Sequence, residues 1–195
     1  QIKYFFALGG KRLRPALTMM SCEAFGGDST KSLDAALSVE TFHNFTLIHD
    51  DIMDSADFRR NKETVHKKWD VATAILVGDA LQALSFELTL NNVVPNSNKL
   101  AYNLAKASGA KGMVMGQALD ISAEKSTAAL SLDDIVKLQQ GKTGALILWA
   151  ITAGAHMADE DVRPLEKYAK AVGLAFQIAD DALDYYAKEK LYIYN

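Results

Sequence analysis

Apolar and polar positions follow one another along most of the chain with the spacing of helices rather than of strands. Phe42, Phe45 and Ile48, for example, stand at intervals of three residues, which places them along one helix face. The segments between the prolines are rich in Ala, Leu, Met, Lys and Glu, which favour helices. The prolines number only three: Pro15, Pro95 and Pro164. No run of alternating β-branched residues with hairpin turns is present, so we expect an all-α fold with essentially no sheet.

Glycine- and proline-containing loops divide this pattern into helices. The expected helices span about 15–25, 31–55, 71–91, 99–122 and 132–155, and a last one follows Pro164. Ser131 fits the N-cap of the helix from 132, with Asp134 three residues on. We expect a single domain over residues 1–195, built as one large helical bundle of roughly eight or more helices around a central cavity.

Two acidic sets of the form D-D-x-x-D stand among apolar residues: Asp50, Asp51 and Asp54, and then Asp180, Asp181 and Asp184. Because four residues advance a helix by about 400°, the first and last member of each set share a face. Aspartates at this spacing are usually a solvated helix face. However, like charges one turn apart destabilise a helix unless something neutralises them. Two such sets in one chain therefore indicate hard cations, which keep several waters and bind phosphates.

Basic residues occur where an anion could bind. Lys11, Arg12 and Arg14 directly precede the first turn of the helix at Pro15, and backbone N–H groups at a helix N-terminus favour anions. The alternative is a basic turn on the surface. The pair Arg59 and Arg60 fits phosphate oxygens, which match guanidinium forks.

Three further polar positions are candidates for a site. His43 lies seven residues before Asp50, although a lone histidine in such a helix is more often a hydrogen-bonded core residue than a ligand. Lys142, followed by Thr143, falls in the middle of an apolar helix. A buried lysine there needs a partner, and a substrate anion is one candidate. Gln177 precedes Asp180 by three residues and faces the same way.

Composition excludes several classes of protein. The hydrophobic share of 49% and the charged share of 23% are those of a globular protein, and a net charge of −3 implies no nucleic-acid patch. The single cysteine, Cys22, allows no internal disulfide; we expect it to be buried and inert, consistent with a cytoplasmic protein. The longest apolar run, Gly144 to Ala155, is too short to span a membrane. Since the chain starts at Gln1, we expect residues before it.

Seven motifs occur together in the order and rough spacing of one family: GGKRLRP, HDDIMD followed by RR, NKETVHKKW, GDAL, GQALD, GKTGAL and FQIADDALD. On these motifs the sequence resembles the trans-isoprenyl diphosphate synthases, the polyprenyl synthetase family, over nearly its whole length. The family normally has a helix or two before GGKRLRP, and the residues after Asp184 match the family poorly. We therefore expect the chain to be truncated at both ends, or its residues after Asp184 to be joined across a gap. Asn61 and Glu63 stand where the family usually has Gly and Pro.

The resemblance implies a prenyltransferase that joins an allylic diphosphate to isopentenyl diphosphate by Mg²⁺-assisted ionisation. About three Mg²⁺ ions would be held by five aspartates: Asp50, Asp51, Asp54, Asp180 and Asp184. The allylic substrate would contact Arg59, Lys142, Thr143 and Gln177. The diphosphate of isopentenyl diphosphate would contact Lys11, Arg14, His43 and Arg60. The residues implied in catalysis are Asp50, Asp54, Arg59, Lys142 and Asp180. The family is usually homodimeric.

Phe45 is the candidate floor of the product pocket. It lies five residues before Asp50, about 7–8 Å further along the helix axis. In the family, a position matching Phe45 is aromatic in short-chain enzymes, which implies products of about 15 to 20 carbons in an apolar pocket. Phe42, one turn deeper, would be a second stop. The alternative is that both rings belong to an ordinary core.

Two other functions remain open. A terpene cyclase also ionises an allylic diphosphate at an acidic motif, but it has no need of the second diphosphate site implied by Lys11, Arg14, His43 and Arg60. A non-catalytic subunit of a heteromeric prenyl synthase is the other, although both acidic sets are intact in this chain.

Overall fold

The chain folds into helices that form two compact units, which are described separately. The computed structural model describes residues 1–126 and 130–193, and within these it describes no side chain for residues 124, 181, 184, 185 and 187–193. Unit 1 comprises Gln1–Ala101 and Ala153–Glu160, and unit 2 comprises Tyr102–Thr152 and Asp161–Asn195. The all-α class expected from the sequence is confirmed, whereas the single domain over residues 1–195 stays a prediction.

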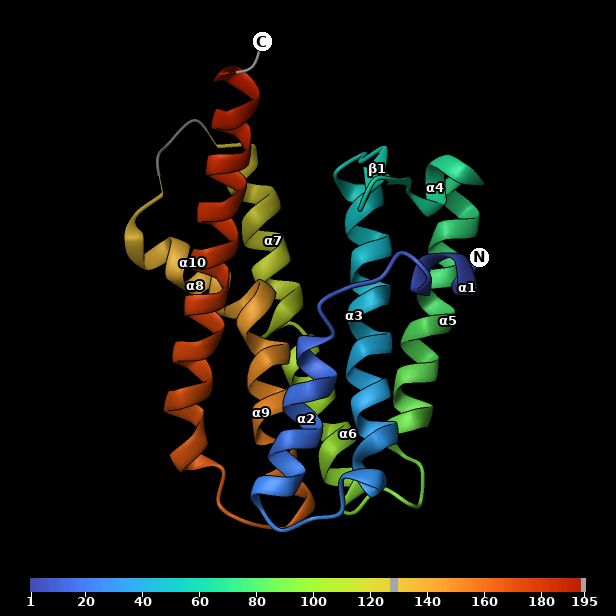
Figure 1. Cartoon of the computed structure of the whole chain (residues 1–195), viewed down its shortest axis with the longest axis vertical. Helices are drawn as coiled ribbons and strands as arrows, with labels where there is room; N and C mark the ends of the chain where they lie inside the picture. Colours follow the sequence, from blue (N-terminus) through green and yellow to red (C-terminus); the bar gives the residue numbers. More distant parts are fainter. Residues whose placement is uncertain (127–129, 194–195) are drawn as a thin grey trace. The chain divides into compact units, whose positions relative to one another are not determined.

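Unit 1 is built on two long helices that run side by side, α3 and α5 (Figure 1). Its elements are α1 (Ile2–Phe6), α2 (Leu13–Ala24), the 3₁₀ turn η1 (Ser29–Ser32), α3 (Leu33–Met53), β1 (Phe58–Arg59), β2 (Lys62–Glu63), α4 (Val65–Lys68) and α5 (Val71–Thr89). Two further helices, α6 (Ser97–Ser108) and α9 (Ala145–Met157), each begin in one unit and end in the other.

Small and polar residues allow α3 and α5 to pack closely. Ser38 donates to the backbone oxygen of Ser85 at 2.7 Å. Gly78 lies against the ring of His49, where an added Cβ would come within 2.2 Å of Nε2. Beside these contacts, a buried apolar cluster joins α1, α3, α4 and α5; its members are Phe5, Ile48, Val65, Ala74, Val77 and Leu81. The interface therefore holds α3 rigidly, and α3 carries the first acidic set.

A short hairpin follows α3, where the sequence pattern predicts no sheet. β1 pairs antiparallel with β2, with Phe58 opposite Glu63. The two residues between the strands, Arg60 and Asn61, have φ of 51° and 61°, as the favoured two-residue hairpin turn requires. Asn tolerates this left-handed region better than most residues. Strands of two residues are too short to give an alternating pattern, which is why the sequence did not show them.

Unit 2 contains the second half of the helices. Its remaining elements are α7 (Met113–Glu124), α8 (Leu132–Gln139), the π-helical turn η2 (Gln140–Gly144) and α10 (Arg163–Ile193). Ser131 caps α8 as predicted, accepting from the Asp134 N–H at 3.2 Å. The single helix predicted over 99–122 is wrong, because the chain breaks between α6 and α7. At Gly112 a Cβ would come within 2.0 Å of the Ala107 oxygen, so this break depends on glycine.

Helix α5 is long and apolar enough to cross a membrane by length and composition. It has 19 residues and a mean hydropathy of 1.4, with 28% of that window buried. A helix from the core of a water-soluble protein meets the same two criteria, so this is only a weak indication of a membrane span.

Candidate functional site

The first acidic set lies at the C-terminal end of α3, and its three carboxylates have different surroundings. Asp50 is half-buried and Asp54 is exposed. They lie one turn apart on the same face of the helix, since the Asp54 N–H donates to the Asp50 backbone oxygen at 2.9 Å. Asp51 points elsewhere, since its residue is only 1% exposed. The structure thus places Asp50 and Asp54 where a solvated cation could reach both, and Asp51 in the interior.

Arg59 joins the two adjacent aspartates of this set. Its Nε donates to Asp51 Oδ1 at 2.7 Å, and its Nη2 lies 3.6 Å from Asp50 Oδ2. Burial raises the pKa of Asp51, and the charge and hydrogen bond of Arg59 oppose that shift. The second oxygen of Asp51 is buried without a hydrogen-bond partner among the described residues. The β1–β2 hairpin therefore delivers a guanidinium to the acidic set, and Asp51 holds it there.

Basic residues gather around His43, on the side of α3 that faces the loop before α2. Burial lowers the pKa of His43 well below its ordinary value, and the charges of Arg14, Arg60, Arg59 and Arg12 lower it further. His43 is therefore neutral at pH 7 and can offer one donor and one acceptor. Three of the four residues expected to bind isopentenyl diphosphate, namely Arg14, His43 and Arg60, thus lie in one cluster.

The loop before α2 folds against this cluster. Arg60 donates from its guanidinium to the backbone oxygen of Gly9. Gly10 has φ of 151°, and a Cβ there would come within 3.2 Å of Arg60 Nη1 and Nη2. Burial and the charges of Arg59 and Arg12 lower the pKa of Arg60, but it remains a cation at pH 7. Lys11, the fourth expected residue, is exposed in the same loop. This concentration of positive charge is suited to a multiply charged anion.

The candidate residues of unit 2 lie around the π-helical turn η2. Lys142 ion-pairs with Asp120 of α7, so the partner that a lysine in this position needs is a protein carboxylate. Thr143 donates to Gln177 Oε1 on α10 at 2.9 Å. Lys142 and Thr143 thus lie on the π turn, a feature frequent at functional sites, and Gln177 of α10 contacts Thr143.

Glycines make this turn possible by allowing backbones to touch. At Gly116 of α7 an added Cβ would lie 2.0 Å from the backbone nitrogen of Lys142, and at Gly173 of α10 it would lie 3.1 Å from the Cα of Gly144. Helices α7 and α10 thus pack directly on η2. No side chain other than hydrogen fits at Gly116 without moving the turn.

Asp180, in the second acidic set, is half-buried on α10, one turn after Gln177. Asp184, an expected metal ligand, and its neighbour Asp181 lie outside the described side chains. The arrangement in which the two acidic helices face each other across a cavity stays a prediction.

The donors of the first set fit Mg²⁺ only with help from other ligands. Among the described residues, no three His, Cys, Asp or Glu side chains lie close enough to hold a metal by themselves. Mg²⁺ is commonly held by one or two carboxylates together with water and substrate phosphates. Asp50 and Asp54 are two carboxylates of this kind.

The aromatic rings proposed to limit product length lie in contact on α3. The ring centroids of Phe42 and Phe45 are 5.1 Å apart, and Phe45 lies 4.9 Å from the ring of His49. Phe42 is 1% exposed and also contacts Phe86 of α5, so it belongs to the core behind Phe45. Phe45 is only half-buried, so part of its ring is accessible to an apolar tail.

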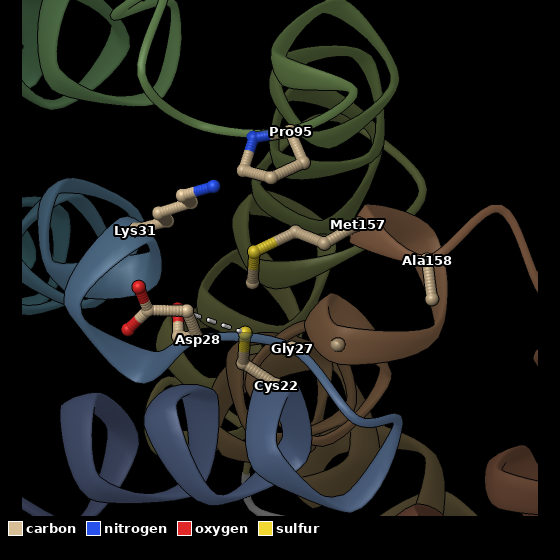
Figure 2. A pocket seen from close by; sticks show the side chains of 8 residues that line it. Cys22, Gly27, Asp28, Lys31, Pro95, Met157 and Ala158 are labelled. Atoms are coloured by element: carbon tan, nitrogen blue, oxygen red, sulfur yellow. Dashed lines mark hydrogen bonds between the residues drawn. The ribbon is translucent and has the colours of Figure 1, made fainter.

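A small pocket in unit 1 is remote from these groups. It encloses about 70 Å³, and Figure 2 shows Cys22, Asp28 and Met157 among the side chains that line it. The Cys22 thiol donates to the Asp28 backbone oxygen at 3.6 Å. Burial raises the pKa of this thiol, so it stays protonated and unreactive at neutral pH, as expected. The pocket adjoins the start of α3, about 25 Å along the helix from Asp50, so it is not part of the candidate site.

Two acidic residues that pair with candidate or neighbouring cations were not expected from the sequence. Asp120 pairs with Lys142, and Glu40 pairs with Arg12. Each pair joins positions more than 20 residues apart, so it leaves no local pattern in the sequence. The sequence shows only that both residues stand in or near candidate motifs: Asp120 ends the GQALD motif, and Glu40 precedes His43 by three residues.

Comparisons with known proteins agree with this geometry. A model of the polyprenyl synthetase family matches residues 1–192, and the chain belongs to that family. It is 44% identical over 195 residues to the farnesyl diphosphate synthase of Escherichia coli (strain K12), covering 94% of this chain and 64% of that protein. It is 40% identical over 194 residues to a putative chloroplastic geranylgeranyl pyrophosphate synthase 8 of Arabidopsis thaliana, covering 94% of this chain and 54% of that protein.

Solved structures show the same fold. An FPP/GFPP synthase from Zymomonas mobilis matches with a TM-score of 0.86 and 47% identity over 90% of this chain and 66% of that one. A geranylgeranyl pyrophosphate synthetase from the archaeon Geoglobus acetivorans matches with a TM-score of 0.88 and 37% identity, over 94% of this chain and 60% of that one. The chain therefore spans between about half and two thirds of the length of these relatives.

Proposed function

We propose that the protein is a trans-prenyltransferase that condenses an allylic diphosphate with isopentenyl diphosphate to give short-chain products of about 15 to 20 carbons in an apolar pocket. The observation that carries this proposal is the pairing, within unit 1, of an acidic set with a separate cluster of cations. Asp50 and Asp54 suit one diphosphate through cations. The cluster around His43, with Arg14 and Arg60, suits a second diphosphate directly.

The reaction begins when the C–O bond of the allylic diphosphate breaks and its electron pair stays on the leaving diphosphate. Arg59 and Lys142 are cations fixed beside the acidic set and on η2, and they would stabilise the charge that develops on the departing oxygens. Gln177 and Thr143 would orient the same substrate through the hydrogen bond they share.

The second substrate then attacks the allylic cation. Held by Lys11, Arg14, His43 and Arg60, isopentenyl diphosphate would present its double bond, whose π electrons form the new C–C bond. A proton is then lost to the released diphosphate, which restores a double bond. Water must be excluded from the cation throughout, since it would otherwise give an alcohol.

The expected Mg²⁺ ligands are Asp50, Asp51, Asp54, Asp180 and Asp184, with Asp181 as a weaker candidate; of these, Asp50 and Asp54 are carboxylates accessible to a solvated cation. When bound, Mg²⁺ supplies Lewis-acid neutralisation of the leaving diphosphate. The number of ions, about three, follows the family resemblance and the few protein ligands that each Mg²⁺ takes.

The test is product analysis with the purified full-length protein, Mg²⁺, isopentenyl diphosphate and allylic diphosphates of increasing length. We expect prenyl diphosphates that form only when both substrates are present. Hydrocarbon or alcohol formed from the allylic diphosphate alone would instead indicate a cyclase. Activity that requires a second, different protein would indicate a subunit of a heteromeric synthase.

The proposal includes a homodimer in the cytoplasm. The side of α5 opposite the buried Ala74 and Leu81 is exposed; Ala72, Leu76, Ala80 and Ala83 lie on it, with Asp79 and Glu87 among them. A long helix with an apolar stripe on its outer side is suited to pack against a second copy of itself. The cytoplasmic location rests on the single buried cysteine, Cys22.

A further inference from the structure

A buried carboxylate lies behind the basic loop that precedes α2. The Glu40 residue of α3 is 8% exposed, and its Oε1 accepts from the Arg12 guanidinium and from Asn44 Nδ2 at 3.1 Å. The same amide of Asn44 donates to the backbone oxygen of Glu40 at 2.6 Å. Glu40 is therefore held in one rotamer by its own helix and presents a fixed negative charge to the loop.

Arg12 pairs with the Glu40 carboxylate, and its guanidinium also donates a hydrogen bond to the protein backbone. Its Nη2 donates to the backbone oxygen of Phe6 at 3.1 Å, and its guanidinium carbon lies 5.9 Å from the centre of the Phe6 ring. Arg12 thus ties α1, α3 and the loop together. Its guanidinium is therefore engaged in the structure of the loop.

The backbone conformation of Arg12 requires stabilising contacts of this kind. Its φ is 50° and its ψ is 33°, in the left-handed region, and it is the N-cap of α2. A non-glycine residue in this region carries strain and persists only when its surroundings hold it. Lys11 stands immediately before it and Arg14 two residues after it. The conformation of Arg12 therefore sets the direction in which the Lys11 side chain leaves the loop and the direction in which α2, with Arg14 in its first turn, begins.

Glu40 also moderates repulsion within the cluster. The charges of Arg59 and Arg12 lower the pKa of Arg60, and the charge of Glu40 acts in the opposite direction. Guanidinium groups gathered with nothing between them would push the loop away from α3 when no anion is bound. Glu40 keeps the cluster assembled before the ligand arrives, which is the condition for tight binding at low cost.

We propose that Glu40 is a positioning residue of the second diphosphate site, acting through Arg12 to hold Lys11 and Arg14 in place. This inference rests on the function proposed above and names the residue that prepares its second site. Glu40 itself does not touch the substrate, since a carboxylate would repel a diphosphate at contact.

Two substitutions that remove the charge, and their combination, test it: Glu40→Gln, Arg12→Met and the double variant. Each single substitution should raise the KM for isopentenyl diphosphate about ten- to hundred-fold, the scale on which residues that orient a site's ligands act. The kcat and the KM for the allylic diphosphate should change little. Because both residues act as one unit, the double variant should be no worse than the weaker-binding single variant. Glu23→Gln, an exposed charge at the far end of α2, is the matched control.

A binding measurement separates this inference from the function on which it rests. Calorimetry with isopentenyl diphosphate, in the absence of Mg²⁺ and allylic substrate, needs no turnover. Glu40→Gln should weaken that binding, and hydrogen exchange at residues 9–13 should speed up while the circular dichroism melt still shows a folded protein. A wild-type protein that binds but forms no product would overturn the proposed function alone. Effects that add in the double variant, or that fall equally on both substrates, would overturn the role of Glu40.

Discussion

At the scale of single residues, Arg59 is the residue on which the acidic set depends before any ligand is bound. It lies 2.7 Å from Asp51 and 3.6 Å from Asp50, so it competes with a cation for the Asp50 carboxylate. Arg59→Gln should therefore tighten Mn²⁺ binding by the substrate-free protein about tenfold, equivalent to 1.4 kcal/mol. The same change should slow the reaction by at least about 10²-fold, because a fixed charge at the leaving group is lost.

Electron paramagnetic resonance of Mn²⁺ measures the first effect, and turnover under saturating substrates measures the second. Arg163→Gln removes an exposed arginine that pairs with Asp161, and it should change neither. Unaltered Mn²⁺ affinity in Arg59→Gln would show that the pair with Asp50 does not restrain the carboxylate.

His43 should make stability depend on pH. Burial and the arginines around it lower its pKa in the folded state, so the unfolded chain binds a proton first as the pH falls. Stability should then decrease below the ordinary pKa of about 6.5, by at most about 1.4 kcal/mol per pH unit for one proton, until the folded-state pKa is reached. His43→Gln should flatten this dependence. Urea unfolding between pH 7 and pH 5 measures it, and parallel curves for both proteins would contradict the prediction.

Phe45 should limit the length of the product. Its half-buried ring lies against Phe42 and His49, about 7–8 Å along α3 from Asp50. Phe45→Ala should shift products to longer chains with little change in the rate of the first condensation. Phe58→Ala removes an exposed ring of the hairpin and serves as the control. If chromatography of the products shows the same distribution for Phe45→Ala as for wild type, another element forms the floor.

At the scale of elements, the π-helical turn η2 depends on the small residue that faces it. A Cβ at Gly116 would lie 2.0 Å from the backbone nitrogen of Lys142. Gly116→Ala should therefore destabilise the protein by about 1–3 kcal/mol, the usual cost of overpacking, and lower turnover by moving Lys142. Ala118→Ser, on the exposed side of the same helix, should do neither. Thermal unfolding followed by circular dichroism checks the difference, and equal stability of the two variants would mean that the turn can shift freely.

The helices were predictable from sequence because their apolar spacing and breaks are local. α3 and α5 begin and end within about two residues of their predicted limits, within the usual uncertainty of helix ends. The π turn was not predictable, because one wider turn leaves the apolar pattern around it almost unchanged. Gly109, Gly112 and Gly116 interrupt the pattern of the helix predicted over 99–122, but they do not show that it ends there, because glycine is tolerated inside helices at modest cost. What decides it is the contact with Ala107, which only the folded chain shows.

The candidate site was predictable to the extent that its motifs are short. The local spacing of Asp50 with Asp54, and of Arg59 with Arg60, is enough to predict that each pair acts at the site. The sequence did not show that neighbouring aspartates have different surroundings. Asp51 is an aspartate like Asp50, but it is buried against Arg59. Partners such as Glu40 and Asp120 depend on how distant helices pack.

At the scale of the whole molecule, the exposed face of α5 predicts assembly. Leu76 is 68% exposed and lies on the side of the helix opposite the buried Ala74 and Leu81. A face of this kind is covered when two copies pack through it, and a two-fold axis would place Leu76 near its own counterpart. Leu76→Glu would then bring two like charges together in a desolvated interface, which costs several kcal/mol. We expect it to convert a dimer into a monomer at micromolar concentration.

Gln82→Glu adds the same charge on another side of α5 and should leave the dimer intact. Sedimentation velocity distinguishes the two, and a wild-type monomer, or a dimer that Leu76→Glu leaves unchanged, would place the contact elsewhere or remove it.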